Sequence, residues 1–295
     1  MSTPYLITGV ATHPQDMRPR LEIRELQKLP EQFTLFQLGW AKVMSKDFTP
    51  EAARFEQLAG IHGMPYTRWP GDPDQETQSV RGPWLGYCNH ASVMFPNWHR
   101  PYVMAIEQPI CEVASGIAGG YASECKANKN QDQADKWLRA ARDLRFPFWD
   151  WTDKSTGAEG IPSILRDETV QLIKSDGQTY DHPNVLAYYS FNKPVDGFTN
   201  RLEIVEIQTS GKPLPEDIAY FREWNRTYRR PNSSPINVTE DYNALNADLE
   251  NKDERGGWAN LTNDIAALFT VPPDIPEDMW ANMWVIITSS SAASD

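Results

Sequence analysis

The sequence has little of what marks a secreted or membrane-spanning protein. Its 295 residues include only three cysteines (Cys88, Cys111 and Cys125), too few and odd in number for a disulfide framework. The opening segment, MSTPYLITGV, has neither a basic stretch nor a long apolar core, so it does not resemble a secretory signal. No run of about 18 apolar residues occurs, so no transmembrane helix is expected. These absences predict a cytoplasmic or otherwise intracellular protein.

Positive charge is also scarce. The chain has 28 basic and 40 acidic residues, a formal net charge of −12. An acidic surface is repelled by phosphate, so neither nucleic acid nor an anionic membrane is expected as a partner. Charges of both signs are well mixed along the chain, which indicates a solvated surface rather than a binding tail. No break in composition divides the sequence, and we expect a single domain over residues 1–295.

Apolar residues at helical spacing are frequent in the first half. In the second of the expected helices, Thr49 would be the N-cap and the end would fall near Gly63. The third would bury Val103 and Val113, and the fourth would turn Leu138 inward. The four expected helices run over Phe33 to Met44, Thr49 to His62, Asn97 to Val113 and Gln133 to Leu144.

Loops are expected elsewhere. A segment rich in proline and glycine, Trp69 to Gly86, separates the second and third helices and predicts a long ordered loop. After Trp151 the helical signal fades among proline, asparagine and aspartate clusters, which favours short elements. The predicted fold class is therefore mainly α, with a helical core and long loops.

Histidine is rare enough for each one to be considered. Of the five, His13 and His182 each precede a proline, which favours extended loop structure and a solvated side chain. His62 lies one helical turn after Leu58 and would point inward. A lone inward histidine is more often a hydrogen-bonded core residue than a metal ligand.

Two further histidines change that reading. His90 lies in the expected loop, and His99 lies at the start of the next helix. A loop and a helix start can bring two imidazoles to one ion, with His62 as a third ligand. Neutral imidazole suits copper, zinc, iron and nickel, so three histidines alone do not select the metal.

Cys88 lies two residues before His90. A free cysteine is often only a small buried hydrophobe. Beside a copper ion, however, a Cys-x-His pair can be oxidised to a thioether that fixes the imidazole ring. The metal is therefore copper if this second interpretation of Cys88 holds.

Several motifs together resemble the tyrosinase family of type 3 copper proteins. The resemblance is dense over residues 1 to about 152 and patchy afterwards. It implies a tyrosinase-type helical bundle, His62, His90 and His99 as the ligands of copper A, and a thioether between Cys88 and His90. It also implies an apolar shell that includes Phe95 and Trp98. The matching stretches are ITGV at 7–10, GIHGMPY at 60–66, CNH at 88–90, FPNWHRPY at 95–102, EQ at 107–108 and FPFWDW at 146–151.

The chain departs from this family at the second copper. The family uses a His-x-x-x-His pair and a further histidine there, whereas no histidine follows His182. The expectation is a chain truncated before the second copper-binding helix pair and incomplete at its C-terminus. A second chain or a downstream segment would then supply the copper-B histidines.

The activity implied by the resemblance is oxidation of phenols and o-diphenols to o-quinones, with copper as cofactor and phenolic small molecules and O₂ as partners. Two alternatives stay open. One is an inactive truncated fragment that acts as a copper-binding or interaction protein. The other is a mononuclear zinc hydrolase with three histidine ligands, against which the Cys88-x-His90 spacing counts.

Overall fold

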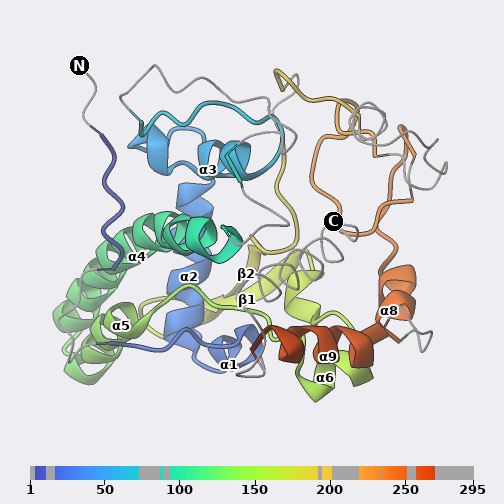
Figure 1. The fold of residues 1–295 in the computed structure, drawn as a ribbon. Helices are drawn as coiled ribbons and strands as arrows, with labels where there is room; N and C mark the ends of the chain where they lie inside the picture. The colour runs from blue at the N-terminus through green and yellow to red at the C-terminus, as the bar shows by residue number, and fades with distance from the viewer. Residues whose placement is uncertain are drawn as a thin grey trace, which may run out of the picture.

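The structure is a computed structural model that describes residues 4–10, 17–72, 87–88, 94–191, 195–200, 219–232, 234–250 and 257–269. Helices dominate these residues, and one hairpin of strands accompanies them (Figure 1). The helices are α1 (Ile23–Gln27), α2 (Pro30–Val43), α3 (Phe55–His62), α4 (Phe95–Ala127), α5 (Gln131–Asp143), α6 (Lys154–Glu159), α8 (Tyr242–Glu250) and α9 (Gly257–Phe269). The 3₁₀ turns are η2 (Glu51–Ala53) and η3 (Ser163–Leu165), and the strands are β1 (Thr169–Ile173) and β2 (Thr179–Pro183).

The long helix α4 is the centre of the bundle and packs against α2 and α5 (Figure 1). Its buried face carries small residues such as Ala114 and Ala118, which let neighbouring helices approach closely. The crossing with α2 depends on Gly39, because a Cβ there would lie only 2.8 Å from the Ile110 carbonyl oxygen. The predicted mainly helical fold is confirmed.

The core lies between these three helices. Phe36 and Trp137 have no exposed side-chain surface, and Trp40 stacks on Phe146 with ring centroids 4.9 Å apart. Each such buried side chain contributes roughly 1.5–3 kcal/mol relative to an exposed one. The aromatic content of the sequence is therefore used mainly to hold the bundle that carries the site.

A buried carboxylate fixes α4 to two other segments. Glu107 accepts two hydrogen bonds from Arg20, both at 3.0 Å, and a third from the backbone N–H of Phe146 at 2.7 Å. The neighbouring Gln108 accepts from the backbone N–H groups of Thr8 and Gly9 and so holds the N-terminal segment along the helix. These contacts fix α4 at the end that carries the FPNWHRPY motif.

The second half of the chain contains more regular structure than the sequence indicates. Strands β1 and β2 pair antiparallel, with Val170 opposite His182. His182 is thus a strand residue and not the loop residue that we expected. Helices α6, α8 and α9 lie together at one end of the molecule (Figure 1), and only short elements were expected there.

Three details of the expected helices are wrong. The second helix begins at Phe55 and not at Thr49, because Pro50 and Arg54 have extended backbone angles that leave only the turn η2 between them. The side chain of Leu138 is 42% exposed. Val103 and Val113 on α4 are only half-buried. The expected loop from Trp69 falls mostly outside the described residues.

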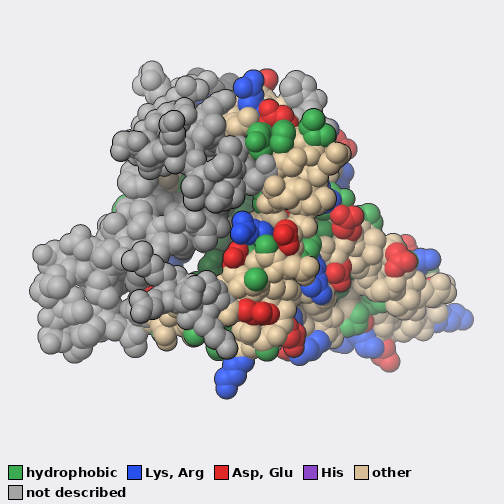
Figure 2. Space-filling view, turned by 90° about the vertical axis from the view of Figure 1, so that its right-hand side faces the viewer, with side chains coloured by type: hydrophobic (Ala, Val, Ile, Leu, Met, Phe, Trp, Pro, Cys, Tyr) green, Lys and Arg blue, Asp and Glu red, His purple; other side chains and the backbone are tan. Residues whose placement is uncertain are grey.

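The described surface mixes both signs of charge. Figure 2 shows acidic and basic side chains interspersed over the coloured face of the molecule, which agrees with a solvated acidic surface. None of the described helices has the length and apolar character needed to cross a lipid bilayer.

Candidate metal centre

Two helix ends bring two imidazoles together. His62 is the last residue of α3, which buries Leu58 and Ile61 and ends at the cap residue Gly63. His99 lies in the first turns of α4, four residues after Phe95. The end of α3 and the start of α4 thus face each other across the candidate site.

The side-chain donors converge closely. His62 Nε2 lies 3.2 Å from His99 Nε2, and Cys88 Sγ lies 3.3 Å from the same His99 nitrogen. The three ligand atoms all lie within 4.8 Å of one another. Cys88 is buried and both histidines are half-buried, so the cluster is partly screened from water.

A backbone carbonyl fixes the tautomer of His99. Its Nδ1 lies 2.7 Å from the carbonyl oxygen of Phe95. Because a carbonyl oxygen only accepts hydrogen bonds, Nδ1 carries the hydrogen and the lone pair of Nε2 points toward His62 and Cys88. Such an outer hydrogen bond is usual for metal-ligating histidine and sets the ring orientation.

Aromatic rings surround the imidazoles. His62 stacks on Tyr102 with a centroid distance of 5.1 Å and an interplanar angle of 20°. The ring centroids of Phe95 and Trp98 lie 4.0 Å and 4.9 Å from that of His99, so both rings contact the imidazole. Burial raises the pKa of the Cys88 thiol to about 12 and also raises the pKa of Tyr102. Both groups are neutral at physiological pH in the metal-free protein.

The donor set fits a bound transition-metal ion. Two nitrogens that each lie about 2.0–2.1 Å from one ion at a tetrahedral angle are roughly 3.3 Å apart. The observed separation of 3.2 Å between the two Nε2 atoms matches this value. Two imidazoles with an adjacent thiol are ligands that copper and zinc both accept.

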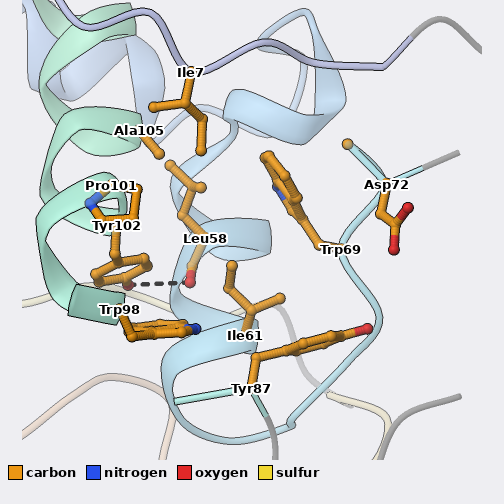
Figure 3. Close-up of a pocket in the computed structure, with 11 residues that line it drawn as sticks. Ile7, Leu58, Ile61, Trp69, Asp72, Tyr87, Trp98, Pro101, Tyr102 and Ala105 are labelled. Atoms are coloured by element: carbon orange, nitrogen blue, oxygen red, sulfur yellow. Dashed lines mark hydrogen bonds between the residues drawn. The ribbon is translucent and has the colours of Figure 1, made fainter. Parts of the chain in front are cut away.

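An apolar cavity of about 390 Å³ lies beside the cluster. Figure 3 shows α3 and α4 forming two of its sides, with Trp69 facing them from the loop that follows α3. Trp98 and Tyr102 belong to its wall and also contact His62. The aromatic shell of the histidines is therefore shared with the cavity.

The predicted site residues are only partly placed. His62, His99 and Cys88 come together, whereas His90 and His13 lie outside the described residues. His182 lies on β2, where its Nδ1 is 2.7 Å from the Pro183 carbonyl oxygen. Tyr102 is not among the predicted site residues, although its position three residues after His99 places both on one face of a helix.

Comparison with known proteins shows which family this chain resembles. The common central domain of tyrosinase matches residues 52–272. The tyrosinase of Neurospora crassa is 34% identical over 195 residues, which cover 64% of this chain and 27% of that protein. Polyphenol oxidase 4 of Agaricus bisporus is 32% identical over 219 residues, covering 74% of this chain and 30% of that protein. The chain therefore spans less than a third of the length of these two relatives.

Solved structures give the same relationship. A crystal structure of latent and active mushroom tyrosinase superposes with a TM-score of 0.56 and 26% identity, covering 94% of this chain and 72% of that one. A copper-bound mutant of active tyrosinase from Aspergillus oryzae, in complex with L-tyrosine, gives a TM-score of 0.53 and 26% identity, covering 67% of this chain and 47% of that one. The chain belongs to the tyrosinase family.

Proposed function

We propose that this chain carries the copper-A half of a centre that oxidises phenols and o-diphenols to o-quinones with O₂. The observation that carries the proposal is the 3.2 Å approach of His62 Nε2 to His99 Nε2 at the junction of α3 and α4. Membership of the tyrosinase family supports copper as the metal. His90 is proposed as the third ligand, and residues 1–295 as one domain.

Each described residue has a separate task in this proposal. His62 and His99 bind the ion, and the Phe95 carbonyl keeps the His99 Nε2 lone pair directed at it. Phe95 and Trp98 exclude water from the imidazole faces. Bound copper would supply the O₂-binding redox chemistry, and the protein supplies ligands, orientation and a dry surround.

The five histidines of the chain are enough for one three-histidine metal site but not for two. No histidine follows His182 in the sequence, so the ligands of a second copper would come from another chain or from sequence outside these 295 residues. We therefore propose that the 295-residue protein alone binds copper but oxidises catechol poorly. Oxidation of phenols by a pair of metals requires both metals to be in place.

Metal titration tests the ligand assignment. The purified protein is loaded with copper(I) without oxygen, and bound copper and zinc are counted by mass spectrometry of the elements. We expect about one copper per chain, abolished by His62→Ala, His90→Ala or His99→Ala and unchanged in the matched variants His13→Ala and His182→Ala. Three results would contradict the proposal. The protein could prefer zinc to copper, it could bind two coppers and oxidise catechol rapidly, or the His182→Ala variant could lose as much copper binding as the ligand variants.

We also propose a thioether between Cys88 and a ring carbon of His90. The bond would form with loss of the thiol hydrogen and one ring hydrogen, and O₂ supplied to the copper-loaded protein would accept the two electrons and two protons and leave as H₂O₂. Peptide mapping after copper and air exposure should show the single peptide that contains Cys88 and His90 lighter by the mass of two hydrogens. Free alkylation of Cys88 after that treatment would exclude the crosslink, with Cys111 as the internal control.

A further inference from the structure

We infer that Tyr102 is a positioning residue that holds His62 in place against His99 through its hydroxyl and its ring. The inference rests on the proposed copper-A function and deepens it. Tyr102 lies on α4, three residues after His99, and its hydroxyl and ring also contact Leu58 and His62 of α3. One side chain thus ties the two ligand-bearing helix ends together.

The hydroxyl restrains the last turn of α3. Tyr102 O–H donates to the Leu58 carbonyl oxygen at 3.0 Å, drawn as the dashed line in Figure 3. Leu58 lies four residues before His62, so its carbonyl belongs to the helical turn that carries the ligand. An eight-residue helix is marginal by itself and its ends fray, so an outside hydrogen bond has a large influence on where His62 lies.

The ring restrains the imidazole itself. The Tyr102 and His62 rings lie 5.1 Å apart at 20°, close to parallel, so rotation of the imidazole about its bond to Cβ meets the phenol ring. Trp98 stacks in turn on Tyr102, at 4.9 Å and 26°. The Tyr102 ring is therefore held by its own helix while it supports a residue of the neighbouring one.

Two variants separate the two contacts. Tyr102→Phe removes only the hydroxyl, and Tyr102→Leu removes the aromatic ring as well. The matched controls are Tyr121→Phe and Tyr121→Leu, because Tyr121 lies on the same helix but packs on Trp137 at 4.8 Å, away from the histidines. Copper(I) affinity is measured without oxygen by competition with a chromogenic chelator, and His62 ring motion is measured by NMR relaxation in the metal-free protein.

We expect Tyr102→Phe to weaken copper(I) binding about 3- to 10-fold and Tyr102→Leu about 10- to 100-fold, the range found for residues that orient metal ligands. His62 ring motion should increase in Tyr102→Leu, while both Tyr121 variants should match the wild type. The inference would be overturned if both Tyr102 variants kept the copper affinity of the wild type. It would also be overturned if the Tyr102 and Tyr121 variants lost copper affinity equally. If Tyr102→Leu does not fold, the copper affinity of Tyr102→Phe still tests the positioning role.

A His62→Ala variant separates the positioning role of Tyr102 from the proposed copper-binding function. Loss of copper binding in His62→Ala with no effect at Tyr102 would refute only the positioning role. Full copper binding in His62→Ala would refute the proposed function itself, whatever the Tyr102 variants show.

Discussion

The two halves of the molecule are held together by different means. Helix α4 in the first half has eleven buried residues, whereas α8 in the second half, which the structure describes completely, has none. The first half depends on apolar packing, and the candidate metal centre lies at the ends of its helices. In the second half, Ile164 and Leu172 share the apolar core, whereas α8 is attached by polar contacts of individual side chains.

Arg226 illustrates the second kind of attachment. It forms an ion pair with Glu168 at 2.8 Å and lies over the ring of Tyr188, with 4.3 Å to the centroid. Nearby, Asn184 donates to the carbonyl oxygens of Ile164 and Asp167 and accepts from the amide of Gln37. Such bonds contribute on the order of 1 kcal/mol each, so losing one is expected to be a smaller and more local event than losing a core side chain.

The largest effect is expected in the bundle, at Trp137. Its ring is fully buried between α5 and α4, and its Nε1–H donates to the Ser175 carbonyl oxygen at 3.2 Å. Trp137→Ala should lower the free energy of unfolding by about 3–5 kcal/mol, as large-to-small changes in a core do. Urea unfolding measures this. Leu138→Ala, at the exposed neighbour, should change the free energy of unfolding by no more than about 0.5 kcal/mol. A similar loss in both variants would show that burial does not set the contribution of α5 side chains to stability.

An intermediate, pH-dependent effect is expected at Cys111 in the same bundle. Burial, together with the nearby Glu107 carboxylate, raises the pKa of this thiol to about 12. Between the ordinary thiol pKa of about 8.5 and this value, the unfolded chain ionises while the folded one does not, so stability falls as pH rises. The contribution of the neutral Cys111 thiol to the free energy of unfolding is fully present below about pH 8 and decreases by roughly 1–2 kcal/mol by about pH 10.

Unfolding by urea at neutral and alkaline pH measures this loss. Cys111→Ala should remove that part of the alkaline decrease, although it also lowers stability at neutral pH through the lost packing. Other groups titrate in the same range, so the comparison is the difference between variant and wild type at each pH. An identical pH dependence in the two proteins would show that Cys111 is reachable by water.

The sequence predicts the helices of the first half better than those of the second. Helical periodicity locates α2, α4 and α5 because apolar packing leaves a repeating pattern in the sequence. It misses α8, since polar contacts such as that of Asn246 with the backbone of Ile161 leave no such pattern. It also misses α9, although Trp258, Leu261 and Ile265 recur there at helical spacing. In the site, His62 and His99 lie at helix ends that can be located from the sequence, so their proximity can be predicted. The proximity of Cys88 to His99 depends on the course of a loop, which the spacing of residues does not predict.

The smallest effect is expected in the second half, at Asn246 on α8. Its side-chain oxygen accepts from the Ile161 N–H at 3.0 Å, and it packs against Gly160, whose φ of +72° lies in the region that favours glycine. Asn246→Ala leaves that N–H without its partner and should cost about 1 kcal/mol. Hydrogen exchange should speed up around residues 160–161 and α8, while exchange in α4 and copper(I) affinity stay unchanged. The control is Asn243→Ala, at an exposed position on the same helix. If Asn246→Ala instead weakened copper binding or loosened α4, the two halves would be one cooperative unit, and the difference between apolar and polar attachment would not set how far a local change spreads.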